Sequence, residues 1–116
     1  MRRMPDRIKK VLDKYVSEVS VIYGQHLMYI LLYGSYARGD YREDSDIDIM
    51  ILVDLDQDAI RSLSKKVSDM TFDINYDNDL MIMPIVQNLV FFRKWVRSHP
   101  FYNNVNNEGI VLYAAT

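Results

Sequence analysis

The chain has 116 residues, a formal net charge of −2, 49% hydrophobic residues and 26% charged residues. This length and composition are typical of a globular protein with its own core, so we expect a single domain over residues 1–116. A mild acidic bias without a basic stripe argues against binding along an extended nucleic acid. The absence of cysteine excludes disulfides and thiolate metal sites and favours a cytoplasmic location.

Two further classes are excluded by the distribution of apolar residues. The basic N-terminal stretch is not followed by an apolar core, so we expect no secretory signal. The apolar runs are too short to span a bilayer, so we expect no membrane partner.

The first half of the chain predicts a helix followed by two strands. Apolar residues recur at three- and four-residue spacing between Pro5 and Gly24, which predicts an amphipathic helix. The mostly apolar residues 26–33 predict a buried strand that ends at a glycine. Residues 35–40 predict a helical turn, and after a polar loop residues 46–53 predict the second strand.

The second half predicts a long helix, a third strand and a further helix. Helical spacing continues from residue 56 or 58 to about residue 76. Residues 79–86 predict a strand in which Pro84 favours an edge position or a bulge. Residues 88–97 predict a helix, and the apolar tail 100–116 should dock on the body.

This order of elements predicts a small α/β domain, classed as α+β by some schemes. We expect a mixed sheet of three or four strands with helices mainly on one face. A helix-sized connection between the second and third strands implies that they are parallel. The starts of parallel neighbours lie side by side, so we expect Asp79 to lie near Asp46 and Asp48.

Two aspartates at the start of the second predicted strand indicate a site for a divalent cation. Side chains alternate along a strand, so Asp46 and Asp48 share one face. Adjacent carboxylates repel each other, and a divalent cation removes that cost. Gly34 and Ser35, just after the preceding strand, offer N–H groups and a hydroxyl to an anion. A metal-bound nucleoside triphosphate fits both features: its metal ion would bind the two carboxylates, and its phosphates would accept from the donors of Gly34 and Ser35.

The ordered pair of motifs resembles a known family. A Gly-Ser turn at residues 34–39 (G-S-Y-A-R-G) precedes a D-x-D strand at residues 45–49 (S-D-I-D-I). This pattern resembles the minimal nucleotidyltransferases of the DNA polymerase beta superfamily. The resemblance continues through the long helix, the Asp79 strand and the tail with Glu108-Gly109, and it implies the nucleotidyltransferase fold.

The resemblance implies a role for each motif residue. Asp46 and Asp48 would be catalytic and would bind two Mg²⁺ ions, which prefer oxygen ligands. Gly34 and Ser35 would hold the β- and γ-phosphates, and Arg38 would neutralise phosphate charge.

A third carboxylate usually completes the site in this family, both as a metal ligand and in activating the acceptor hydroxyl. Asp79 is the first candidate for this position in the chain, and Asp77 and Asp73 are the alternatives.

The reaction implied by the resemblance is the transfer of a nucleoside monophosphate, in the simplest case AMP from ATP, to an acceptor hydroxyl. Since the chain is short, we expect another chain to complete the acceptor site. Minimal members of the family are often antitoxins of helical HEPN-type toxins and can adenylylate a tyrosine on the toxin. The alternatives are an antitoxin-like binding protein without catalysis, and a homodimer that modifies small molecules of the aminoglycoside type.

Simpler explanations exist for the same residues. A calcium loop starting at Asp44 is rejected, because its sixth and twelfth positions hold Ile49 and Leu55 instead of glycine and glutamate. The aspartates could merely cap a strand beside solvent, and Arg38 could equally be a solvated loop charge.

Overall fold

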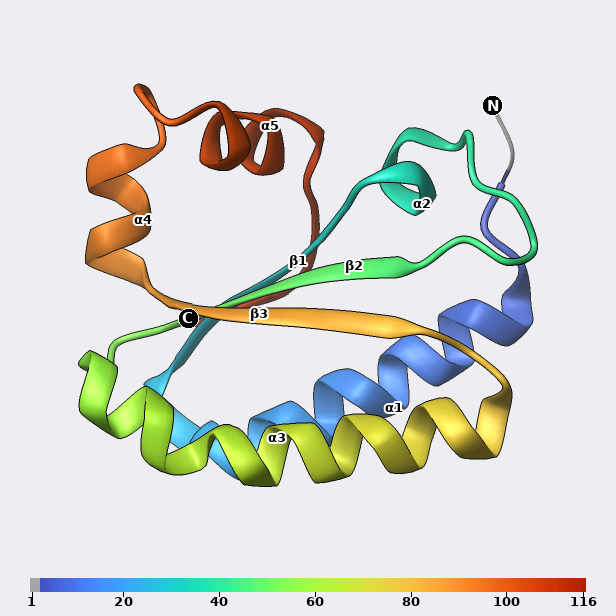
Figure 1. Ribbon diagram of the computed structural model, residues 1–116, viewed down its shortest axis with the longest axis horizontal. Coiled ribbons are helices and arrows are strands. Elements are labelled where there is room, and N and C mark those ends of the chain that lie inside the picture. The colour runs from blue at the N-terminus through green and yellow to red at the C-terminus, as the bar shows by residue number, and fades with distance from the viewer. Residues whose placement is uncertain (1–2) are drawn as a thin grey trace.

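A single mixed sheet organises the protein, whose computed structural model describes residues 3–116. The first two residues of the predicted domain and of its basic N-terminal stretch lie outside the described residues. The strands are β1 (Leu27–Tyr33), β2 (Ile47–Val53), β3 (Ile82–Asn88) and β4 (Ile110–Ala114), in the order β3-β2-β1-β4. β1 is antiparallel to β2 and to β4, whereas β2 and β3 are parallel, as predicted. The predicted fold class is confirmed (Figure 1).

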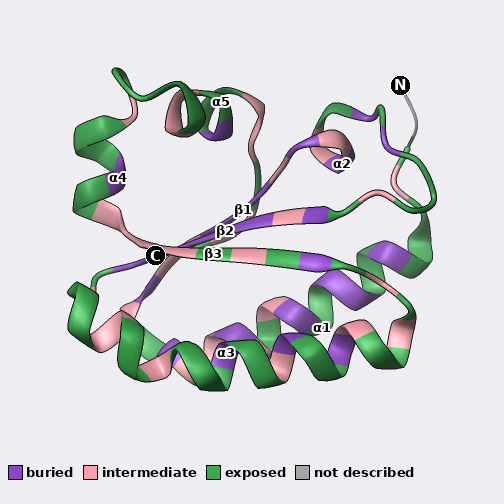
Figure 2. Cartoon of the chain, in the orientation of Figure 1, coloured by how far each residue is buried: buried purple, intermediate pink, exposed green. Residues whose placement is uncertain are grey.

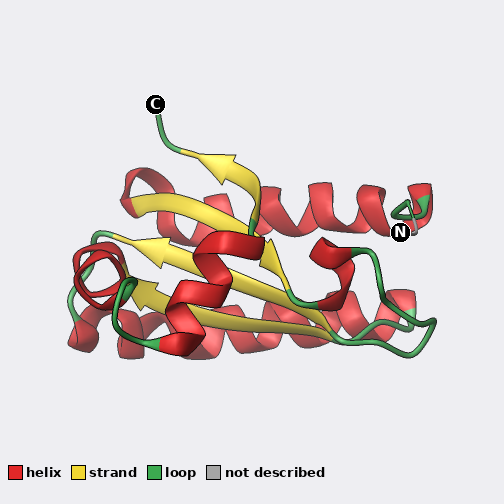
Figure 3. Ribbon diagram, turned by 90° about the horizontal axis from the view of Figure 1, so that it is seen from above, coloured by secondary structure: helices red, strands yellow, loops and turns green. Residues whose placement is uncertain are grey.

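Helices cover both faces of this sheet unequally. The long helices α1 (Asp6–Tyr23) and α3 (Gln57–Asn78) lie side by side over one face (Figure 1). The shorter helices α4 (Leu89–Trp95) and α5 (Pro100–Glu108) lie over the other face, in front of the strands in the view from above (Figure 3). A 3₁₀ turn, η1 (Gly24–His26), follows α1, and the single turn α2 (Ser35–Arg38) follows β1. No helix among residues 3–116 is long and apolar enough to cross a membrane.

The central strand β2 is buried from both sides (Figure 2). Ile47, Ile49 and Ile51 belong to the core cluster beneath α1 and α3. Met50 and Leu52 belong to a second cluster that includes residues of α4 and α5. This alternation shows which face each β2 residue occupies, so Asp48 lies on the face of α4 and α5.

The start of the third strand differs from the prediction. Asp79 does not begin the strand but ends α3 in the left-handed conformation, with φ 52°. β3 begins three residues later, where the Asn75 side chain accepts from the Ile82 N–H at 2.8 Å and donates to the Ile82 carbonyl at 3.1 Å. Pro84 lies on an edge strand, as predicted, where a missing N–H is tolerated.

The C-terminal tail docks on the body as expected, and it adds the fourth strand that the apolar pattern did not resolve. α5 packs through the fully buried Val105 against Leu31 and Met50. β4 then pairs with β1, and the Ala115 N–H donates to the Met28 carbonyl at 2.8 Å. The tail is therefore part of the folded domain.

Substitution of Val105 tests this docking. Val105→Ala removes two buried methyl groups, so the free energy of unfolding should fall by about 2 kcal/mol. Val21→Ala is the matched control, because Val21 is 82% exposed on α1. We expect it to change the free energy of unfolding by less than about 0.5 kcal/mol. Equal effects in urea unfolding of the two variants would contradict the docking of α5.

Candidate active site

Gly34 is pressed against Asp48. Its backbone, at φ 77° and ψ −155°, lies in a region that is essentially open only to glycine. A Cβ atom at this position would collide with Asp48 Oδ2. Glycine therefore serves two purposes here: it makes the turn from β1 into α2, and it leaves room for the Asp48 carboxylate.

The register of the sheet brings the two motifs together. Tyr33, the last residue of β1, pairs directly with Asp48 across the antiparallel ladder. Gly34 follows Tyr33 and so reaches the same carboxylate. Asp46 lies just before β2 and is exposed, and by strand alternation it shares the face of Asp48. The structure thus brings Gly34, Asp46 and Asp48 to one corner of the sheet.

The electrostatics of this corner favour a cation. Partial burial and, to a lesser extent, the neighbouring charge of Asp46 raise the pKa of the Asp48 carboxyl, and Arg38 partly opposes this shift by lowering the pKa. Burial, with a further contribution from the Asp48 charge, also raises the pKa of Tyr33 to about 12. Burial is the main cause of both shifts, and a neighbouring carboxylate adds to each. A divalent cation would neutralise that added negative charge.

Ser35 offers donors at the same corner. The Gly34 carbonyl accepts from the N–H groups of Ala37 and Arg38 at 3.1 and 3.0 Å, which closes the turn α2. Neither the N–H nor the hydroxyl of Ser35 has a hydrogen-bond partner among residues 3–116. Both groups are available to an anionic ligand, as expected for a phosphate-binding turn.

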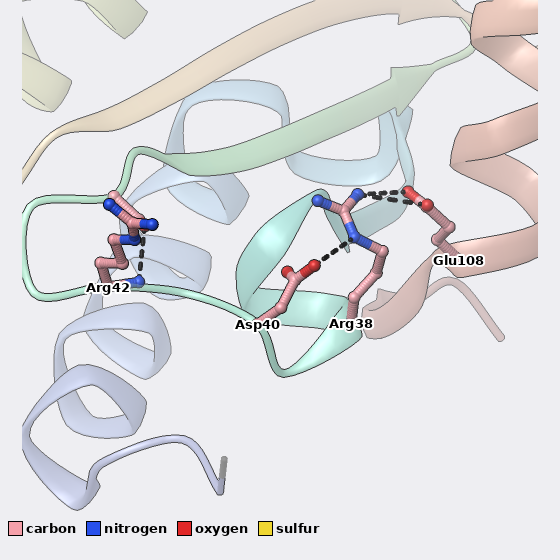
Figure 4. A network of polar contacts seen from close by, with 5 residues as sticks. Arg38, Asp40, Arg42 and Glu108 are labelled. Atoms are coloured by element: carbon pink, nitrogen blue, oxygen red, sulfur yellow. Dashed lines mark hydrogen bonds and ion pairs between the residues drawn. The ribbon is translucent and has the colours of Figure 1, made fainter. Parts of the chain in front are cut away.

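Arg38 is held by two carboxylates (Figure 4). Its Nε donates to Asp40 Oδ2 at 3.3 Å, and its Nη1 donates to both Glu108 oxygens at 3.2 and 3.3 Å. These bonds raise the pKa of the guanidinium. Arg38 is therefore anchored rather than a freely solvated loop charge. The contact between Arg38 and Glu108 could not be predicted from the sequence, because no local pattern links residues 70 positions apart.

The predicted third carboxylate does not join the pair. Asp79 caps α3, the helix that covers the face of the sheet opposite Asp48, and lines one polar pocket with Arg7 and Tyr41 and another with Asp44 and Ser45. The alternatives Asp77 and Asp73 are exposed on α3. Among residues 3–116 no three acidic or histidine side chains form a group that could hold a metal.

The register of β3 explains this absence. The β3 residue beside Asp48 is Met83, and β3 carries no acidic residue over its whole length. The prediction placed Asp79 at the start of the strand, whereas in the structure Asp79 is the C-cap of α3. The described residues thus supply a two-carboxylate site.

Comparison with known proteins identifies the family. The model of the Polymerase beta, Nucleotidyltransferase family matches residues 6–115. The chain belongs to this family and is a nucleotidyltransferase. Its fold and its Gly-Ser and D-x-D motifs agree with that assignment, so the predicted resemblance is confirmed.

Several relatives come from Methanocaldococcus jannaschii. "Putative protein adenylyltransferase MJ0604" is 37% identical over 105 residues, which are 90% of this chain and 97% of that protein. "Putative protein adenylyltransferase MJ0141" is 30% identical over 89% of this chain and 96% of that protein. A solved structure described as "Crystal structure of the toxin-antitoxin with AMP-PNP" is 23% identical, with a TM-score of 0.47, over 96% of this chain and 73% of that chain. This structural similarity is too low to identify a function.

A pair of glycine substitutions tests the contact with Asp48. Gly34→Ala and Gly24→Ala both place a side chain at positive φ and carry strain of about 1–3 kcal/mol. Only at Gly34 does the methyl group collide with Asp48, whereas at Gly24 it meets no atom within 4 Å. We expect Gly34→Ala to lower the free energy of unfolding by at least about 1 kcal/mol more than Gly24→Ala. Equal losses in urea unfolding would contradict the close contact.

The raised pKa of Asp48 makes a second prediction. A carboxyl with a raised folded-state pKa loses stabilisation as pH rises from its unfolded pKa through its folded pKa. Without divalent cations, Asp48→Asn should therefore be more stable than the unsubstituted protein at about pH 7 but not at about pH 3. Asp44→Asn is the control for the loss of one negative charge. A less stable Asp48→Asn variant at neutral pH would contradict this account.

Proposed function

We propose that this protein transfers AMP from ATP to an acceptor hydroxyl with the help of Mg²⁺. The observation that carries this proposal is the packing of Gly34 against Asp48, which sets a donor-bearing turn beside a pair of carboxylates. The names of the relatives, protein adenylyltransferases, support adenylyl transfer in particular. The cytoplasm, where ATP is available, is the location that fits.

The residues at the site fit Mg²⁺. Asp46 and Asp48 present hard oxygen ligands on one face. The raised pKa of Asp48 reflects burial and, to a lesser extent, repulsion by Asp46, and a divalent cation would relieve that repulsion. Two carboxylates leave coordination positions for phosphate oxygens and water, which Mg²⁺ commonly retains. We propose that these two residues hold the metal, and that Asp79 contributes at most after a rearrangement of the α3 cap. Bound Mg²⁺ would stabilise the negative charge of the attacking and leaving oxygens.

The chain's own groups would bind and orient the nucleotide. The Ser35 N–H and hydroxyl would donate to the β- and γ-phosphates, which Gly34 allows to approach closely, and Arg38 would neutralise part of their charge. The acceptor oxygen forms a bond to the α-phosphorus while the bond between that phosphorus and the β-phosphate oxygen breaks. Pyrophosphate leaves and the hydroxyl proton passes to solvent. Catalysis then depends on positioning and charge, without a covalent protein intermediate.

The acceptor in our proposal is a hydroxyl on a partner protein, with this chain as the antitoxin of a helical HEPN-type toxin. The names of the relatives specify protein substrates. Exposed apolar side chains also adjoin the site: Met83 is 46% exposed and Ile85 40% exposed, and by the register of β3 both lie on the face of Asp48. Such a surface suits contact with another protein.

Labelled ATP tests this function. The purified protein, Mg²⁺ and the product of the adjacent gene are incubated with ATP labelled at either the α- or the γ-phosphate. Adenylyl transfer predicts label on the partner from α-labelled ATP only, and none when the divalent cation is chelated. The double variant Asp46→Asn, Asp48→Asn should lower transfer by at least about 100-fold.

The control variant is Asp44→Asn, which removes a carboxylate from the neighbouring loop. We expect it to retain transfer within about twofold, a change typical of a surface substitution. Transfer of the γ-label would indicate phosphoryl transfer instead. Undiminished labelling by the double variant would contradict the proposed site.

A further inference from the structure

The Arg38 guanidinium has a defined orientation. Nε is bonded to Asp40 and Nη1 to Glu108, whereas Nη2 has no partner among residues 3–116. A guanidinium is planar and rigid, so fixing two of its nitrogens fixes the direction of the third. Arg38 also lies close enough to Asp48 to lower the pKa of that carboxyl. One pair of N–H donors is thus left available beside the carboxylate pair.

The two carboxylates that hold Arg38 belong to residues with an ordered backbone, and the Asp40 side chain is the more exposed of the two, at 65%. Asp40 follows the turn α2, where its N–H donates to the Ser35 carbonyl at 3.2 Å. Glu108 is the last residue of α5, and its side chain is only 29% exposed. The two acceptors approach the guanidinium from different elements, as Figure 4 shows.

Helix α5 is anchored beside the site at both ends. At its start, Phe101 packs edge-on against Tyr33, with ring centroids 5.7 Å apart. In its last turn, Val105 is fully buried and its carbonyl accepts from the Gly109 N–H at 2.8 Å. Glu108 therefore projects from a docked helix rather than from a mobile tail.

We propose that Glu108 is a positioning residue for nucleotide binding. Together with Asp40 it orients the Arg38 guanidinium so that Nη2 faces the β- and γ-phosphates of the nucleotide. The C-terminal helix thereby contributes to the phosphate site without touching the nucleotide. This inference rests on the proposed function, since it requires a nucleoside triphosphate at Gly34 and Ser35.

Two possible effects of Glu108, orienting Arg38 and repelling phosphate by its charge, predict opposite changes in nucleotide affinity when Glu108 is removed. Glu108 carries a negative charge near the expected position of a polyphosphate, so its removal should tighten binding if only charge mattered. If Glu108 orients Arg38, its removal should weaken binding, because the freed guanidinium must be ordered when the nucleotide binds. The sign of the change separates the two roles.

Calorimetric titration with a non-hydrolysable ATP analogue and Mg²⁺ measures this sign. Glu108→Ala should raise Kd by about fivefold and Arg38→Ala by about tenfold, as expected for loss of a charge-assisted hydrogen bond. Adding Glu108→Ala to Arg38→Ala should not weaken binding further. Glu108→Asp retains the charge with a shorter reach, so it should also weaken binding. Glu108→Gln, which keeps one acceptor oxygen and the side-chain length, should weaken binding less than Glu108→Ala.

The control is Asp54→Ala, which breaks the 2.7 Å pair between Asp54 and His26 at the far end of β2. It should leave Kd within about twofold. Circular dichroism confirms that each variant is folded. Unchanged or tighter binding by Glu108→Ala, or an equal loss in the Arg38→Ala background, would overturn the inference and leave the proposed function intact. Failure of the unsubstituted protein to bind the analogue would overturn both.

Discussion

The contact between Gly34 and Asp48 is the constraint on which the site depends. It exists because β1 and β2 pair in a register that sets Tyr33 opposite Asp48, so the residue after Tyr33 must pass the carboxylate. Any side chain there would collide with Asp48 Oδ2. The register is set in turn by the core, since a slip by one residue would move the β2 isoleucines to the wrong face.

The same arrangement has an electrostatic cost. Asp48 is partly buried beside Asp46, and its pKa is raised as a result. A strand buried on both faces can hold such a carboxylate, because the apolar contacts of its neighbours fix the backbone. Strain and repulsion of this kind concentrate at functional sites, where a ligand relieves them. The carboxylate pair that carries this electrostatic cost, Asp46 and Asp48, is also the proposed metal site.

The fold could be predicted from local patterns, whereas the completion of the site could not. Helical spacing and apolar runs located α1, α3 and the strands β1, β2 and β3, and the connection between β2 and β3 implied their parallel pairing. The assignment of Asp79 to a strand was wrong, because Asn75 pairs with Ile82 and delays the start of β3. Glu108 was missed because its contact with Arg38 depends on how α5 docks, which no local pattern encodes.

A crystal structure with Mg²⁺ and a non-hydrolysable ATP analogue tests the central claim most directly. We expect metal density at the carboxylates of Asp46 and Asp48, with the β- and γ-phosphates on the Ser35 N–H and hydroxyl. Nucleotide bound elsewhere, for example in the polar pocket that Arg7 and Asp79 line, would contradict it.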